Sequence, residues 1–328
     1  MAEVRLDPSC PDTTFKCQMQ LRKGDEDRSY LHRIIVPILY LNEIPGAMDK
    51  MGWVNSAKLM RNWFANPAWR MSKEEREGLE KNTGKPIVYA NLPSSRIEES
   101  IIKMDWVLKH PEAQKAYQFL RSNWNTPRGA GLLYNRLIAT GWRPGTSYFR
   151  LGNREDRASI IDNTNQVNAR PFGSLLDTFD DFFGAINKAT MKVALTGYTE
   201  YDKVHKKDFF IVTQEGYYIR DTYDFNTDSW YEDPLMGLGV WSRDRVLSKA
   251  ETLDYKTRIA KILVPADYVR TLYMYGGFVP VINNDFYRWQ DKHGTGGDFF
   301  VFSDVLWLPN QPHMTKIEIL PFLGNKQK

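Results

Sequence analysis

Apolar residues at helical spacing dominate the first part of the chain. In residues 53–65, apolar side chains recur every three or four positions, which places them on one face of a helix. The same spacing, closed by Pro, Gly or Asn, recurs in three further segments: 96–110, 111–123 and 131–140. Ser72 and Glu75 form a capping box that predicts another helix start, and 33–41 is predicted as a short apolar strand. Residues 1–147 are therefore predicted to form an α-rich region.

The pattern changes in the second part of the chain. After a polar stretch, a wide apolar face over 174–186 predicts a helix capped by Ser174. The apolar period then becomes two, which predicts a meander of three consecutive strands at 191–201, 209–214 and 216–225. Later patterns predict a basic helix at 243–263 and strands at 278–282 and 298–308. Residues 148–328 are therefore predicted as an α+β domain, with one long helix packed on an antiparallel sheet.

Composition and charge narrow the functional classes. The 44 basic and 40 acidic residues give a net charge of +4, and the basic residues are scattered, which argues against a nucleic-acid partner. The longest apolar stretch, 34–41, is too short for a transmembrane segment. The first residues lack the charged-then-apolar pattern of a signal peptide, so we expect production in the cytoplasm without general secretory export. Cys10 and Cys17 lack a metal or redox spacing.

The strand predicted at 216–225 ends in an unusual acidic cluster. Asp and Asn are depleted in strand interiors because their side chains compete for backbone hydrogen bonds. Alternation places Asp221 and Tyr223 on one face, and a turn at the strand exit can bring Asp224 toward the same point. Two neighbouring carboxylates can bind Mg²⁺ together with substrate phosphate oxygens. The alternative is structural: Asp224 and Asn226 form an Asx-turn and Asp221 is solvated.

This region resembles the catalytic domain of colicin M-type bacteriocins. The resemblance lies in a helix ending "FFGAINKAT", a strand containing Gly197, a strand after Gly216, and the following "DTYDF". It covers residues 174–245 and implies metal-dependent cleavage of lipid II, the polyprenyl-pyrophosphate carrier of peptidoglycan precursors. By the match, Asp221, Tyr223 and Asp224 carry over as site residues, with Asp221 and Asp224 as the metal ligands.

The chain departs from that family pattern in one respect. The family places a His and an Arg a few residues after the second Asp, and "NTDSWYED" contains neither. Arg243 or Arg245 could supply the guanidinium that holds a phosphate, through a longer loop. His293, beside a glycine-rich turn, could supply the general acid or base. The ordinary alternatives are a solvated helix start for the arginines and a hairpin-like loop for the segment after His293.

The whole chain also resembles an uncharacterised group of proteobacterial proteins often encoded beside type VI secretion genes. "LGVWSRDRVLSK" and "NNDFYRWQDKHGTGGDFFVFSD" carry this likeness. It implies a secreted toxin acting in the periplasm of a target bacterium, with a cognate immunity protein and a secretion-apparatus spike or adaptor protein as partners. Residues 1–147 would then be the delivery or adaptor-binding region.

Three functional hypotheses remain after the sequence analysis. The first is an antibacterial toxin that hydrolyses lipid II with Mg²⁺ or another divalent cation. The second is a non-enzymatic adaptor or chaperone for a secreted effector, which would need no acidic cluster. The third is a metal-dependent phosphodiesterase on another substrate, against which the lack of a basic stripe argues.

Overall fold

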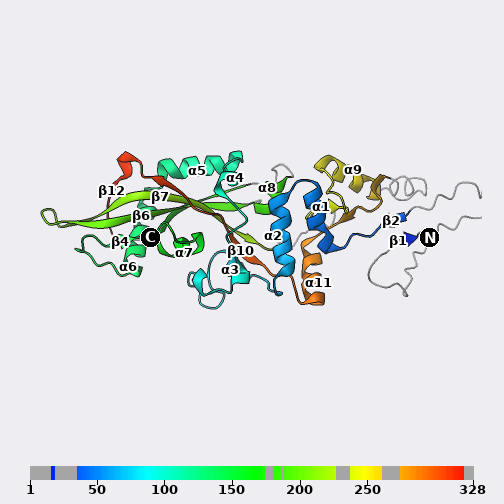
Figure 1. Cartoon of the computed structure of the whole chain (residues 1–328), viewed down its shortest axis with the longest axis horizontal. Helices are drawn as coiled ribbons and strands as arrows, with labels where there is room; N and C mark the ends of the chain where they lie inside the picture. Colours follow the sequence, from blue (N-terminus) through cyan, green and yellow to red (C-terminus); the bar gives the residue numbers. More distant parts are fainter. Residues whose placement is uncertain are drawn as a thin grey trace, which may run out of the picture. The chain divides into compact units, whose positions relative to one another are not determined.

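The structure is a computed structural model, and it describes residues 16–18, 35–173, 180–186, 188–226, 237–260 and 274–320. By its contacts the chain divides into two compact units (Figure 1). The first unit comprises residues 1–64 and 225–294, and the second comprises 65–224 and 295–328. The boundary expected between residues 147 and 148 falls inside the second unit. Each unit is therefore built from segments that lie far apart in the sequence.

The second unit is organised around a long β-hairpin. Its strands, β6 (Ala189–Asp202) and β7 (Lys207–Tyr223), pair in antiparallel register from Thr190 opposite Arg220 to Asp202 opposite Lys207. The remaining strands of this eight-stranded sheet, as far as the residues are described, are β3 (Ile97–Glu98), β4 (Arg150–Leu151), β5 (Gln166–Phe172), β10 (Phe299–Phe302), β11 (Leu306–Pro309) and β12 (Lys316–Glu318).

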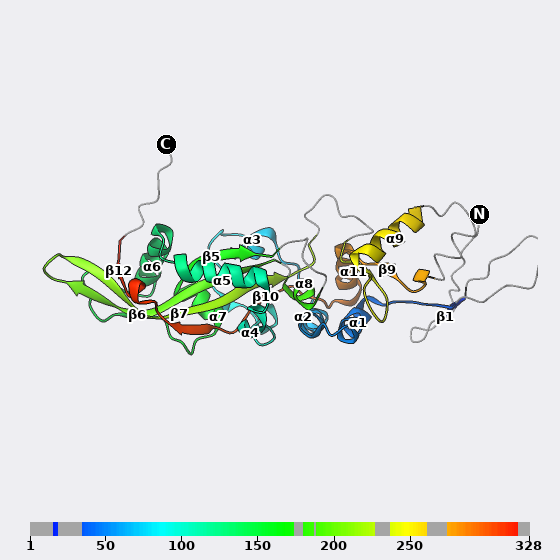
Figure 2. The same cartoon turned by 90° about the horizontal axis from the view of Figure 1, so that it is seen from above.

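The sheet is dominated by antiparallel pairing. Strands β10, β11 and β12 pair with β7, whereas β4 and β5 pair with β6 (Figures 1 and 2). Only β3 among the described strands of the sheet is parallel to its neighbour, β10. With helices on the sheet, this arrangement confirms the predicted α+β class.

One part of the predicted meander is wrong. The segments predicted as separate strands at 209–214 and 216–225 form the single strand β7, and Gly216 lies in its interior. Gly216 is opposite Trp307 of β11, and a Cβ atom there would lie 2.6 Å from the Trp307 ring. The glycine therefore makes room for an indole rather than a turn.

Helices and 3₁₀ turns cover the sheet. They are α3 (Lys73–Arg76), η2 (Tyr89–Asn91), η3 (Ser94–Arg96), α4 (Met104–Val107), α5 (Pro111–Asn123), α6 (Pro127–Ala139), α7 (Ala158–Thr164), α8 (Asp181–Ile186) and η4 (Pro312–Met314). Helices α5 and α6 pack on β5. The capping box of Ser72 and Glu75 is confirmed, and so are the helices at 111–123 and 131–140.

Two other predicted helices are found only in part. The helix predicted at 96–110 is wrong except for α4, because Glu98 accepts hydrogen bonds from the backbone of Ser100 and Ile101 and fixes a non-helical turn. Of the helix predicted at 174–186, the described part is α8, and its expected cap Ser174 lies outside the described residues.

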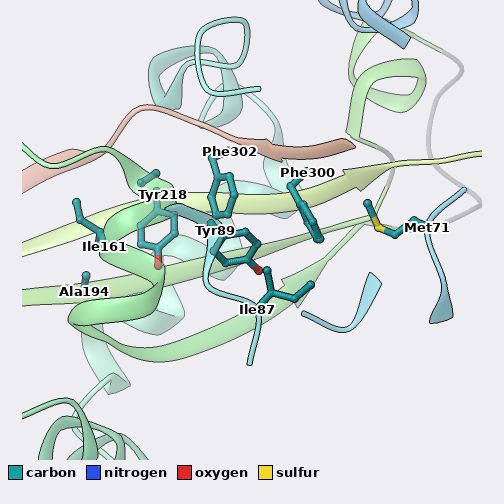
Figure 3. Close-up of a cluster of buried hydrophobic side chains, with 9 residues drawn as sticks. Met71, Ile87, Tyr89, Ile161, Ala194, Tyr218, Phe300 and Phe302 are labelled. Carbon is teal, nitrogen blue, oxygen red and sulfur yellow. The ribbon is translucent and has the colours of Figure 1, made fainter. Parts of the chain in front are cut away.

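The core on one face of the sheet is rich in aromatic rings. Tyr89 makes edge contacts with Phe300 and Phe302 of β10, each with a ring-centre distance of 5.1 Å (Figure 3). Tyr218 of β7 and Ile161 of α7 close the same cluster (Figure 3). The cluster attaches both α7 and the segment around Tyr89 to the sheet through buried apolar area.

The first unit contains shorter elements. They are β1 (Lys16–Gln18), β2 (Ile35–Pro37), η1 (Leu41–Glu43), α1 (Ile44–Lys50), α2 (Val54–Ala65), β8 (Val240–Trp241), α9 (Lys249–Ala260), β9 (Val279–Pro280) and α11 (Asn283–His293). Helix α2 confirms the prediction for 53–65, and its Trp63 packs edge-on against Phe225 and Phe286. Helix α11 was not predicted. Across the described residues of both units, no helix combines the length and apolarity that membrane crossing requires.

The close approach at Gly197 leads to a stability prediction. A Cβ atom at Gly197 would lie 2.1 Å from the backbone oxygen of Ile211 and 2.7 Å from the Phe210 ring. Gly197→Ala must therefore displace the β6–β7 ladder, and we expect it to lower the free energy of unfolding by about 1–3 kcal/mol. Urea unfolding followed by far-UV circular dichroism measures this loss.

Gly46→Ala is the matched control. Gly46 lies in α1, where an added Cβ would meet no atom within 4 Å, so this variant should gain up to about 1 kcal/mol. Equal unfolding midpoints for the two variants would contradict the steric explanation of Gly197.

Candidate functional site

The predicted site residues Asp221 and Tyr223 share one face at the end of β7. In the ladder with β10, Asp221 is opposite Val301 and Tyr223 is opposite Phe299, while Thr222 between them is opposite Phe300 of the aromatic core. Strand alternation thus places Asp221 and Tyr223 on the face away from that core. The structure brings these two residues together as expected.

Asp221 lies in an environment that disfavours its charge. Its side chain is largely shielded from water, and this desolvation raises the pKa of the carboxyl well above its usual range. The negative charge of Asp224 raises the pKa further, whereas the Thr222 backbone N–H and the Arg220 guanidinium oppose the rise. Asp221 is therefore a carboxyl that holds its proton more tightly than a solvated aspartic acid, a property common among catalytic acids.

Tyr223 is more enclosed than its predicted role suggests. It is buried, and its ring stacks on Phe299 with the ring centres 5.3 Å apart. Burial raises the pKa of the Tyr223 phenol, so the side chain stays neutral at physiological pH. A neutral hydroxyl can donate a hydrogen bond to a phosphate oxygen but cannot supply charge.

Asp224 turns to a different side of the strand from Asp221. Its Oδ1 atom accepts a hydrogen bond of 2.8 Å from the Thr222 hydroxyl, and its Oδ2 atom lies 3.8 Å from Nε of Arg76. The expected turn that brings Asp224 to the face of Asp221 and Tyr223 is therefore not what the structure shows. The side chain of Asp224 is only 7% exposed, so the Arg76 guanidinium compensates a largely desolvated charge.

Arg76 is a site residue that the sequence analysis missed. It ends α3, whose capping box fixes the helix start, and it donates a hydrogen bond of 3.0 Å to the Met71 carbonyl. Arg220 of β7 donates to the Arg76 carbonyl at 2.9 Å and to the Tyr89 hydroxyl at 2.8 Å. Two guanidinium groups thus lie around the Asp224 side of the strand end. In the sequence, "KEER" is typical of a solvated helix face, so no local signal distinguished Arg76.

The other predicted residues lie in the first unit, whereas Asp221, Tyr223 and Asp224 lie in the second. Arg243 forms an ion pair of 3.0 Å with Glu43, and Arg245 forms one of 2.8 Å with Glu251. His293 ends α11, where its ring stacks on Trp289 at 4.0 Å, and Gly294 in the left-handed conformation caps the helix. Each of the three therefore has a structural role within its own unit.

The glycine-rich segment after His293 also has a structural explanation. A Cβ atom at Gly297 would lie 2.2 Å from the Pro67 carbonyl oxygen, and Gly296 adopts a positive φ of 92°. The Gly296 amide donates to the Asn66 carbonyl at 2.9 Å. The expected hairpin-like loop is instead a strip of chain hydrogen-bonded to residues 66–69.

A second charged group lies on the Tyr218 face of the sheet. Nζ of Lys192 lies 2.6 Å from Oδ1 of Asp162, and the Tyr218 hydroxyl donates to the same oxygen at 2.6 Å. Burial lowers the pKa of Lys192, while Asp162 opposes the shift. Arg136 donates to the carbonyl of Asp162 at the end of α7. These bonds hold α7 against the sheet.

His110 is a further titratable group in the second unit. Its ring stacks on Phe182 of α8 with the ring centres 3.7 Å apart, and burial lowers the pKa of the imidazole. Both α8 and the adjacent α4 contact β7. In the sequence, His110 follows an ordinary amphipathic segment, so no local pattern distinguishes it.

The fit of a divalent cation can be judged from the donor groups. Mg²⁺ prefers carboxylate oxygens, and Asp221 and Asp224 supply two. Within the described ranges, however, no group of three or more His, Cys, Asp or Glu side chains could hold a metal. Asp224 also faces Thr222 and Arg76 rather than Asp221. As they stand, the two carboxylates do not form one shared site, and the metal ligands stay a prediction.

The raised pKa of Asp221 predicts a pH-dependent effect on stability. Because the folded-state pKa lies above the unfolded value near 3.8, the contribution of Asp221 is full below about pH 3.8 and is lost as pH rises through the folded pKa. Asp221→Asn cannot ionise, so it should gain stability relative to the parent above about pH 4, with a slope of at most about 1.4 kcal/mol per pH unit. Chemical unfolding of the variant and the parent at several pH values measures this difference in the free energy of unfolding.

Asp105→Asn, an exposed substitution in α4, is the control for this series. It makes the same chemical change at an exposed position outside the end of β7, so it tests whether any Asp→Asn substitution gives the same pH-dependent gain. A pH-independent difference for Asp221→Asn would contradict the desolvated environment of Asp221.

The comparisons with known proteins identify a family. No curated protein and no solved structure gives a match. A family model, described as a family of unknown function (DUF6402), matches residues 39–317, which is most of the chain and includes the end of β7 and parts of both units. The chain therefore belongs to the DUF6402 family of unknown function.

Proposed function

We propose that this protein is an antibacterial toxin that hydrolyses the polyprenyl-pyrophosphate linkage of lipid II, with the end of β7 as its active site. The observation that carries the proposal is Asp221, a shielded carboxyl of raised pKa on one face of the strand end, while Asp224 with the Arg76 and Arg220 guanidinium groups lies on the other side of the same strand end. Strongly perturbed carboxyl groups with specific charged partners are typical of catalytic centres. The "DTYDF" likeness to colicin M-type toxins supports the choice of substrate.

The chemistry assigns Asp221 the role of general acid. Hydrolysis forms a bond between a water oxygen and phosphorus and breaks the bond from that phosphorus to the prenyl oxygen. The departing prenyl alkoxide is strongly basic, so it needs a proton as the bond breaks. A carboxyl whose pKa is raised by burial can, in its protonated form, deliver a proton to that oxygen, and the attacking water then returns a proton to the carboxylate.

The Arg76 guanidinium has the role of phosphate ligand in this proposal. Its Nε atom lies 3.8 Å from Oδ2 of Asp224, and its Nη1 group donates to the Met71 carbonyl at 3.0 Å. A pyrophosphate is a stronger partner for a planar guanidinium because it offers two adjacent anionic oxygens. Asp224 would orient Arg76, and the Tyr223 hydroxyl would donate to a phosphate oxygen.

The biological setting is part of the proposal. The protein would be produced in the cytoplasm, exported through a type VI secretion apparatus by binding its spike or an adaptor, and act in the periplasm of a target bacterium. A cognate immunity protein would protect the producer. Mg²⁺ or another divalent cation, which the colicin M resemblance implies, would neutralise pyrophosphate charge when bound.

A reconstituted reaction tests the proposal. Purified protein is incubated with lipid II in detergent, with Mg²⁺ or with a chelator, and free polyprenol is quantified after chromatographic separation. We expect the parent to release polyprenol, and Asp221→Asn to lower kcat/KM by about 10²- to 10⁴-fold because the general acid is lost. Arg76→Gln should cost about 10²-fold or more through lost charge stabilisation.

Asp105→Asn is again the matched control and should retain the parent rate. Intact lipid II in every reaction, with folding verified by circular dichroism, would contradict the proposal. Retained killing by Asp221→Asn and Asp224→Asn in bacterial competition would then favour the adaptor. Metal-dependent cleavage of another phosphodiester, lost in the same variants, would favour the other phosphodiesterase.

A further inference from the structure

The turn between β6 and β7 is a well-defined projection of the second unit. Asp202 accepts hydrogen bonds from the backbone of Val204 at 2.8 Å and of His205 at 3.0 Å, and its other oxygen lies 2.8 Å from Nδ1 of His205. Lys206 completes the turn with a positive φ of 54°. The β6–β7 hairpin extends past its neighbouring strands and ends at this turn (Figures 1 and 2). The turn therefore presents its side chains from a fixed backbone.

Apolar side chains are unusually exposed at this end of the hairpin. Val204 is 85% exposed and Tyr148 is 79% exposed, the two highest values among the large apolar residues of the described chain. Tyr148 donates its backbone N–H to the Thr199 carbonyl of β6, and its ring stacks on Tyr198 at 5.8 Å. We define the tip surface as residues 143–148 and 198–208 with the adjoining 316–320.

The backbone of Tyr148 adds to this observation. Tyr148 has a positive φ of 63°, which is rare and costly for a bulky side chain without a compensating role. At this position the ring is 79% exposed, although one face stacks on Tyr198. Isolated exposed apolar residues need no explanation, but an exposed tyrosine with a positive φ at the same end of the hairpin as Val204 does.

The acidic side chains of the tip surface are bonded within the protein, whereas several of its basic side chains are not ion-paired within the part of the chain that the structure describes. All four of its acidic side chains bind within the protein: Asp202 to the turn, Asp208 to the Gly145 amide, Glu200 to Lys316 and Glu318 to Lys207. By contrast, Lys203, Lys206 and Arg143 form no ion pair with any described residue and are exposed. The tip surface therefore presents free positive charge around exposed Val204 and Tyr148.

We propose that the tip surface docks on a membrane that contains anionic lipids, with Val204 entering the headgroup region, Tyr148 at the interface, and Lys203 and Lys206 against lipid phosphates. Tyrosine is enriched at membrane interfaces, and basic residues near an anionic leaflet each add binding energy.

This inference goes beyond the proposed hydrolysis and does not depend on it. Docking needs no intact active site, because the tip surface includes none of the candidate catalytic residues. If both proposals hold, docking would bring the enzyme to the surface where a prenyl-linked substrate lies. A test on vesicles without lipid II separates the two, since it reads binding and not turnover.

Vesicle flotation tests the docking. The full chain is mixed with vesicles of phosphatidylglycerol and phosphatidylcholine in equal parts, or of phosphatidylcholine alone, and the bound fraction is measured. We expect binding to the anionic vesicles that weakens at high salt. Lys203→Gln with Lys206→Gln should lower the affinity by roughly 30-fold, at about fivefold per lysine, and Val204→Ser should lower it further.

Val54→Ser with Lys58→Gln on α2 is the matched control, since both side chains are exposed and lie outside the tip surface. This control should bind as the parent does, and circular dichroism should show all variants folded. No binding to anionic vesicles, or the same loss in the control as in the tip variants, would overturn the proposal. Binding to polyglutamate that equals vesicle binding and is unchanged by Val204→Ser would also overturn it, in favour of an acidic protein partner.

Discussion

The antiparallel pairing of β6 with β7 is the constraint on which the rest of the second unit depends. Every other strand of the described sheet pairs with one of these two strands, or with β10, which itself pairs with β7. Two positions in these strands require glycine because another group lies too close for a Cβ atom. At Gly197 that group is the Ile211 carbonyl, and at Gly216 it is the Trp307 ring. The ladder is long, with one register shift between Thr196 and Gly197. The acidic strand end lies at one end of it and the basic turn at the other.

The strand end separates two carboxylates that are close in sequence. Alternation places Asp221 away from the aromatic core, and the Thr222 hydroxyl and Arg76 hold Asp224 on the other side. Asp221 is thus shielded from solvent and forms no ion pair with any residue that the structure describes, whereas Asp224 pairs with Arg76. Differences of this kind are how neighbouring carboxyl groups acquire separate roles in catalysis. Arg220 donates to both the Arg76 carbonyl and the Tyr89 hydroxyl, and Tyr89 packs on Phe300. These contacts connect the candidate site to the aromatic core.

Local patterns predicted some elements well and others poorly, for identifiable reasons. The helices at 53–65, 111–123 and 131–140 have a clear apolar face, and they are confirmed. Helix α11 was missed because its polar sequence offers few apolar positions, although Gly294 is a typical C-terminal cap. The apolar residues of 96–110 fit a helix, but side-chain bonds from Glu98 fix a turn instead. The glycine at 216 suggested a strand break because its true reason, an indole from β11, lies far away in sequence.

By itself the sequence determined the α+β class, most of the regular helices, the strand that ends in acids, and the shared face of Asp221 and Tyr223. These follow from periodicity and alternation, which are properties of neighbouring residues. Only the tertiary structure decided that Arg76 accompanies Asp224, that the chain forms units from separated segments, and that Tyr148 lies beside β6. Such contacts join residues far apart in the chain, and they depend on how strands and helices pack, for which no local pattern carries a signal.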